Sequence, residues 1–358
     1  MNKLILGTCL LAALSSCSKD DAANNHGVTD EGVEVKFNSG VSTLTPTTVT
    51  TRSGAINTFI PKGEHVGIYG IPAIKSNPDS YTIDQFTDEG QFQKNLFNAN
   101  YQVMSGSGTT SVLQQQFVAK FPSNKSGYDA LAFYGYYPYM DTQNIEDLGK
   151  GYAYIPIRIN KDNMTQTNDY LYTGQYISGI TTTAVNLPFK HALAKLVFRI
   201  YASDLTTIGK NPVRINSITV QAYYSTDGYM DLRTGEITPN KSYVPVSFTY
   251  PLTDSYVAIE STPATVAPIA DFLVVPGDKI AVISCSLTET KTNYTKEYVI
   301  YDIDEYLNTP EGRIIPQKGE AINVNVLYTP RDVIINSELK PWVVNDAETR
   351  SFFIDANK

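Results

Sequence analysis

The clearest pattern along the chain is a two-residue alternation of apolar and polar positions, which predicts half-buried strands. It first occurs in Val33-Glu34-Val35-Lys36-Phe37. The strongly apolar run 131–137, ended by Pro138, predicts a buried strand, and apolar positions alternate again over 322–328. Long helical periodicities are absent, and the 25 tyrosines and many Thr, Val and Ile residues favour strands. The chain is therefore predicted to be mostly β.

A second set of predicted strands follows residue 188. These strands cover 191–200, 215–223, 243–250, 271–275, 279–287, 296–301 and 321–328. Turn residues separate them at the spacing typical of a sandwich or barrel. Because 358 residues exceed one average domain, we expect two domains, at 32–187 and 188–358.

The N-terminus has the layout of a secretory signal. Lys3 precedes an apolar stretch over 4–14 that is too short to span a bilayer as a stable helix. Small residues then lead to a cysteine, Leu14-Ser15-Ser16-Cys17, which resembles the lipobox of bacterial lipoproteins. This resemblance implies removal of residues 1–16 and acylation of Cys17. The residues that follow are polar, which predicts a flexible tether over 17–31. The alternatives are an ordinary secretory signal or a short membrane anchor.

Composition narrows the partners and the compartment. The formal net charge is −8 and no cluster of Lys and Arg occurs, so nucleic acid and anionic membrane surfaces are poor partners. After processing, Cys285 would be the only free thiol, which excludes an intrachain disulfide. Since Cys285 lies in an apolar run, we interpret it as a small core residue.

No motif in the chain indicates an enzyme. The three histidines are far apart, and neither a nucleophile elbow, a phosphate loop nor a dinucleotide glycine fingerprint occurs. We expect no catalytic residue, no cofactor and no metal, although carboxylates are too numerous to exclude an acidic pair from sequence. His191 is interpreted as a core or domain-junction histidine with a satisfied ring nitrogen. Trp342 is interpreted as a packing anchor, with a sugar platform as the alternative.

Several segments together resemble one family, the fimbrillins, which are lipoprotein subunits of type V pili. The matching segments, besides the lipobox, are Thr51-Arg52, GEHVGIY (63–69), YDALAFYGYYPY (128–139), DYLY (169–172), LPFKHALAKLVF (187–198) and Pro341-Trp342. The resemblance implies two tandem transthyretin-like β-sandwich domains. It also implies that a trypsin-like surface protease cuts the lipidated precursor after an arginine in an early loop.

Carried over to this chain, the resemblance assigns specific residues. The cut would fall between Arg52 and Ser53, and Arg52 is the first arginine of the chain. The strand 33–41 would leave with the lipid and vacate the places of Val33, Val35, Phe37 and Val41. A neighbouring subunit's C-terminal segment would fill the slot, and in this chain that donor would be 343–358. Its apolar residues are Val343, Val344, Phe352 and Ile354.

Three functions remain open at this point. The leading one is a stalk or tip subunit of a pilus that supports adhesion, held at the outer membrane by its lipid before cleavage. Its partners would be other pilin subunits, the protease and a host or glycan ligand. The second is a non-polymerising surface lipoprotein, including a pilus anchor, that binds glycans or host proteins. The third, a secreted hydrolase, has no motif behind it.

Overall fold

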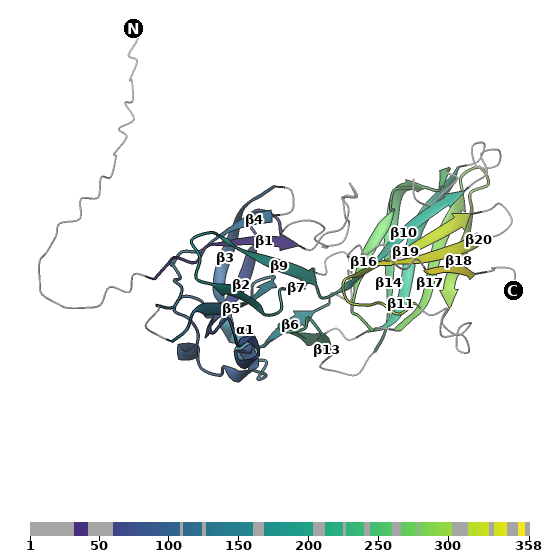
Figure 1. Ribbon diagram of the computed structural model, residues 1–358. Helices are drawn as coiled ribbons and strands as arrows, with labels where there is room; N and C mark the ends of the chain where they lie inside the picture. Colours follow the sequence, from purple (N-terminus) through teal and green to yellow (C-terminus); the bar gives the residue numbers. More distant parts are fainter. Residues whose placement is uncertain are drawn as a thin grey trace, which may run out of the picture. The chain divides into compact units, whose positions relative to one another are not determined.

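The computed structural model describes thirteen stretches of the chain, and strands dominate them (Figure 1). They are residues 32–41, 60–107, 110–123, 127–159, 168–202, 212–224, 227–239, 244–259, 266–277, 279–302, 314–328, 333–341 and 350–354. The prediction of a mostly β chain is confirmed.

The first sheet has eight strands in the order β2-β3-β4-β1-β9-β7-β5-β8, and β2 also pairs with β5. The bounds are β1 (Phe37–Val41), β2 (His65–Ala73), β3 (Ala99–Ser107), β4 (Thr110–Gln114), β5 (Ala130–Tyr137), β7 (Leu171–Tyr172), β8 (Tyr176–Gly179) and β9 (Val185–His191). Since β2 pairs with both β3 and β5, all of these strands except β8 form a closed ring. Strand β1 lies in this ring between β4 and β9 (Figure 1).

The close approach of β2 and β5 depends on a glycine in the segment 63–69. Gly67 pairs with Tyr136, and a Cβ at Gly67 would lie 2.1 Å from Cε1 of the Tyr136 ring. Any larger residue would displace this buried ring. Four short helices lie between the strands of this region, namely η1 (Pro78–Ser80), η2 (Ile83–Gln85), η3 (Glu89–Gln91) and α1 (Thr142–Glu146).

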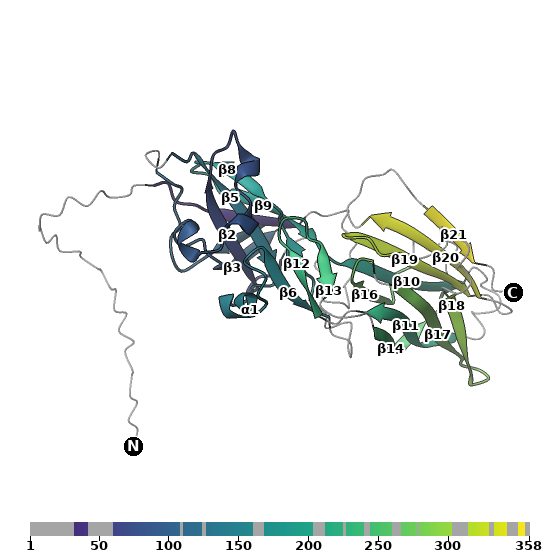
Figure 2. The same cartoon turned by 90° about the horizontal axis from the view of Figure 1, so that it is seen from below.

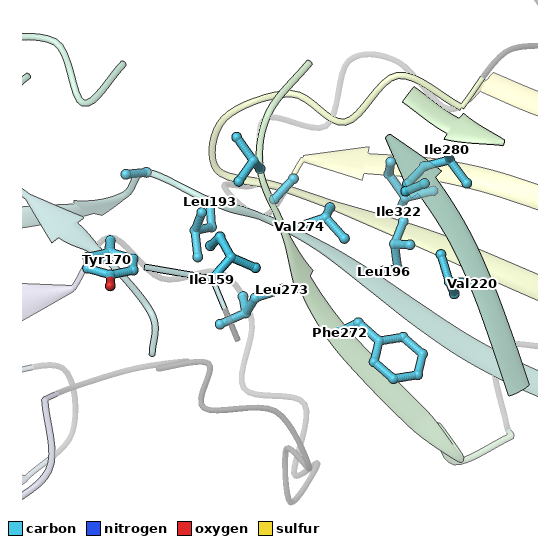
Figure 3. Close-up of a cluster of buried hydrophobic side chains, with 14 of the residues drawn as sticks. Ile159, Tyr170, Leu193, Leu196, Val220, Phe272, Leu273, Val274, Ile280 and Ile322 are labelled. Carbon is cyan, nitrogen blue, oxygen red and sulfur yellow. The ribbon is translucent and has the colours of Figure 1, made fainter. Parts of the chain in front are cut away.

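Two further sheets, of six and four strands, follow His191 in the sequence (Figure 2). One contains β15 (Ala258–Ile259), β10 (Ala194–Ala202), β19 (Glu320–Tyr328), β20 (Val333–Pro341) and β21 (Arg350–Ile354), with β16 (Ala270–Val274) also paired to β10. The other has the order β14 (Val244–Tyr256), β11 (Val213–Tyr224), β17 (Lys279–Glu289) and β18 (Tyr294–Asp302). Side chains from both sheets, including Leu196, Val220, Phe272, Ile280 and Ile322, share one apolar core (Figure 3).

A small third sheet joins strands from both halves of the sequence. Strand β6 (Tyr154–Arg158) pairs with β12 (Asp227–Asp231), which pairs in turn with β13 (Ile237–Pro239). In the turn after β12, Arg233 contacts Asp231 at 2.6 Å and Asp84 at 2.7 Å. The expected boundary at residue 188 falls inside β9, and the change from one set of strands to the next occurs between His191 and Ala194.

Candidate functional site

The candidate site is the slot that β1 occupies, because β1 is an interior strand bonded on both sides. It is antiparallel to β4, with Phe37 opposite Leu113, and parallel to β9, with Phe37 opposite Val185. The residues just before β1 are also paired, since the Val35 N–H donates to the Ala119 carbonyl at 2.9 Å. The sequence pattern places the strand at 33–37, whereas the regular ladder covers Phe37–Val41.

Alternate side chains of this segment point into the core of the ring. Val35, Phe37 and Val41 are 4%, 1% and 3% exposed, and all belong to one apolar cluster, against which the half-buried Val33 also packs. The Phe37 ring meets Tyr101 at 5.2 Å and Phe133 at 4.9 Å, edge to face in both cases. Phe37 is therefore the main anchor of the strand.

The same inward face carries one polar residue that sequence reasoning missed. Ser39 is fully buried, and its Oγ has no hydrogen-bond partner among the described residues. The hydroxyl of Tyr101, on the wall of the slot, is likewise buried without such a partner in the described part of the chain. Burial raises the pKa of Tyr101, so this hydroxyl stays protonated. Extending the alternation from Val35 by two steps would have placed Ser39 inside.

Among the described residues, the outward side chains of β1 and of the residues just before it make weak contacts. Lys36 and Glu34 form an exposed ion pair at 3.9 Å, and the Asn38 side chain donates to Asn186 Oδ1 at 3.1 Å. Exposed pairs of this kind add little stability. The retention of β1 therefore depends on its inward side chains and its two backbone ladders.

The other residues assigned from the resemblance are only partly described. Cys17, Arg52, Ser53, Val343, Val344 and Trp342 lie outside the described residues. Phe352 and Ile354 lie in β21, where they are opposite Ser337 and Ile335 of β20. In the described strand order, β21 is at the edge of its sheet.

Two buried polar pairs lie near the start of the second set of strands. His191 Nδ1 lies 2.9 Å from Asp169 Oδ2, and Lys195 Nζ lies 3.1 Å from Asp271 Oδ2. The interpretation of His191 as a core histidine with a satisfied ring nitrogen is confirmed. Cys285 is also buried, as predicted, and burial raises its pKa to about 12, which keeps the thiol protonated and unreactive.

Neither a metal centre nor a membrane helix is found in the described part of the chain. Across the described stretches, no group of three or more His, Cys, Asp or Glu side chains could hold a metal ion. No helix formed by these residues is long and apolar enough to cross a membrane.

Solved structures with a similar fold include a fimbrial protein and a cell-adhesion candidate. No curated protein matches the chain. Among solved structures, a protein from Bacteroides uniformis assigned provisionally to cell adhesion is similar with a TM-score of 0.54 and 15% identity, covering 88% of this chain and 100% of that one. A fimbrial protein from Bacteroides vulgatus is similar with a TM-score of 0.51 and 11% identity, covering 86% and 99%. These likenesses show a shared fold.

The family comparison covers most of the sequence. Residues 47–342 match the family described as Fimbrillin-like, a range that includes every described strand except β1 and β21. The segments that suggested the resemblance in the first place, from GEHVGIY to LPFKHALAKLVF, fall within this range. The chain belongs to the fimbrillin-like family.

Proposed function

We propose that the chain is a stalk or tip subunit of a type V pilus that polymerises by strand exchange after its first strand is removed. The observation that carries the proposal is the place of β1. It is an interior strand of a ring, yet it is the first strand of the described chain and is joined to Ile60 only through residues 42–59. One cut in that segment therefore separates β1 from everything that follows.

Loss of β1 would leave a slot that favours refilling. The facing edges of β4 and β9 would each expose unpaired backbone donors and acceptors, which is the template for strand addition. Three buried side chains, Val35, Phe37 and Val41, would leave the core. At about 1.5–3 kcal/mol for each, an equivalent set of apolar side chains would contribute roughly 5–9 kcal/mol before ordering costs.

The remaining roles follow from the resemblance of the sequence. Cys17 would carry the lipid that holds the precursor at the outer membrane, and a trypsin-like protease would cut between Arg52 and Ser53. The released subunit would enter the pilus, with Val343, Val344, Phe352 and Ile354 as its donor residues for the next subunit. We also propose that the domains at 32–187 and 188–358 are tandem transthyretin-like sandwiches, supported by the change of sheet after His191.

Replacing the proposed cleavage residue tests this function. Arg52→Ala is compared with Arg158→Ala, which removes the next arginine, an exposed residue of β6. We expect Arg52→Ala to retain β1 and to abolish fibres in electron microscopy, while Arg158→Ala assembles as the wild type does. Unchanged fibres in the Arg52→Ala strain would refute the role given to Arg52.

The second function, a non-polymerising surface lipoprotein that binds glycans or host proteins, is favoured by exposed aromatic residues. Tyr294 and Tyr256 are 60% and 49% exposed, and such rings can stack on sugars. This function predicts a protein that stays monomeric after protease treatment. It also predicts loss of glycan binding in Tyr294→Ala, measured on a glycan array.

A further inference from the structure

The inward face of β1 carries a buried polar residue at its centre. Two of its three buried positions, Phe37 and Val41, are apolar, but Ser39 between them places a hydroxyl at a site with no solvent exposure. Its neighbours across the ladders are Ser111 on β4 and Leu187 on β9. The Ser111 hydroxyl donates to the Ile60 carbonyl at 3.3 Å. Among the described residues, Ser39 Oγ has no partner.

The wall of the slot also carries a buried polar group, the hydroxyl of Tyr101. Tyr101 is 2% exposed and its ring lies against Phe37, but its hydroxyl has no partner among the residues that the structure describes. Elsewhere in the same ring the buried Tyr136 hydroxyl donates to Asn98 Oδ1 at 2.6 Å, whereas the buried Tyr69 hydroxyl, like that of Tyr101, has no partner among the described residues. With β1 in place, two hydroxyls around Phe37 are buried without a hydrogen-bond partner in the described part of the chain.

An uncompensated buried hydroxyl makes the strand that carries it easier to lose. Burying such a group without a partner costs free energy, whereas an apolar group of similar size costs none. A strand with a small apolar residue in the register of Ser39 would make the same backbone ladders without this penalty. The native strand is thus not the best occupant of its own slot.

We propose that Ser39 makes β1 a weak occupant, and that the slot selects the incoming strand of a second subunit by an apolar residue in the register of Ser39. The selection rests on the strand exchange proposed above. In this chain, Phe352 and Ile354 of β21 are apolar and two residues apart, the same spacing as Phe37 and Ser39. A serine in β1 therefore biases exchange toward release of β1.

The first test measures, in the full, uncut chain, how much the buried Ser39 hydroxyl lowers the stability of the protein. Ser39→Ala is compared with Ser111→Ala, the same substitution one strand away, where the hydroxyl does have an acceptor. We expect Ser39→Ala to raise the midpoint of denaturant unfolding and Ser111→Ala to lower it. A midpoint that is unchanged or lowered in Ser39→Ala would overturn the proposal.

The second test measures whether the slot prefers a strand with an apolar residue at the position of Ser39. A specific protease site is inserted into 42–59 of the full chain, the chain is cut, and labelled peptides of residues 32–42 compete with the cut strand. Three peptides are compared, namely wild type, Ser39→Ala, and Asn38→Ala, whose change faces outward. We expect the Ser39→Ala peptide to bind about tenfold more tightly than the other two, from the penalty of one buried unpaired hydroxyl.

The two tests separate the inference from the function on which it rests. Equal binding of the wild-type and Ser39→Ala peptides would overturn the selection, even though strand exchange itself occurs. If no peptide enters the cut chain but Ser39→Ala still raises the unfolding midpoint, the proposed strand exchange is overturned and the weakness of β1 at Ser39 is supported.

Discussion

Phe37→Ala is the most informative perturbation of the slot. The Phe37 side chain is 1% exposed and contacts Tyr101 and Phe133 edge to face, at 5.2 Å and 4.9 Å between ring centres. Its removal deletes the largest side chain of β1 while leaving the backbone ladders to β4 and β9 in place. The effect therefore isolates the contribution of side-chain burial to the retention of the strand.

The structure sets the size of the effect. Truncating a buried Phe costs about 3–5 kcal/mol, as lost transfer free energy plus the cavity that remains. Each well-formed aromatic pair adds about 0.5–1.5 kcal/mol beyond area burial, which places Phe37 in the upper part of that range. Because tenfold in rate corresponds to about 1.4 kcal/mol, a loss of about 4–5 kcal/mol should release the β1 fragment of a cut chain about 1,000- to 4,000-fold faster.

Two measurements check this prediction. Urea unfolding of the uncut chain gives the loss of stability, and size-exclusion chromatography after a cut in 42–59 gives the release of the fragment. Asn38→Ala is the control, because it removes only an exposed hydrogen bond to Asn186 from the adjacent position. A surface change of this kind should shift stability by no more than about 0.5 kcal/mol.

Equal stability and equal fragment release in Phe37→Ala and Asn38→Ala would contradict this prediction. A loss of less than about 1 kcal/mol in Phe37→Ala, well below the cost of emptying a buried aromatic site, would mean that β1 is not held by its inward side chains. Release of the fragment at the wild-type rate after cutting would mean the same. If Phe37→Ala does not fold, Phe37→Leu serves instead, with a smaller loss in the same direction.

Further predictions concern buried polar groups away from the slot. Asp169→Ala should cost about 1–3 kcal/mol in denaturant unfolding because it removes the buried hydrogen bond between Asp169 and His191, whereas Glu34→Ala, in the exposed pair with Lys36, should cost at most about 1 kcal/mol. Cys285, with its pKa raised to about 12, should resist thiol reagents in the folded protein near pH 8 and react once urea unfolds it; labelling of the native protein at the unfolded rate would contradict its burial. Burial also raises the pKa of Tyr134 from 10.0 to about 12. The stability that the protonated Tyr134 contributes should therefore be complete below pH 10 and be lost as the pH rises through 12. Tyrosinate absorbance would measure the ionisation, and circular dichroism would measure the unfolding. Ionisation of every tyrosine near pH 10 without unfolding would contradict this assignment.

The sequence predicts the strands better than it predicts their partners. Alternation at 33–37 correctly indicates a strand, but the ladder begins only at Phe37, because residues before it pair with 119–121 through the bridge between Glu34 and Lys120. The parallel pairing of β1 with β9 joins segments far apart in the chain, and no local pattern encodes it. The pairing of β6 with β12 across the two halves escaped prediction for the same reason.

The candidate slot could be predicted only in part. Val35, Phe37 and Val41 are identifiable as inward residues from alternation alone, and the structure places them in one cluster. Ser39 shares their parity, but its polarity argues for the outward face, so sequence reasoning passed over it. Tyr101 could not be placed beside Phe37 because that contact depends on the register of β3 and β4.

The most direct test of the central claim is the mature N-terminus of this subunit in assembled fibres. Fibres would be purified from the surface of cells that express the wild-type chain, and the subunit's first residues sequenced. Loss of β1 after a cut at Arg52 predicts a chain that begins at Ser53. A chain in the fibre that still begins at Cys17 and retains residues 33–41 would contradict it.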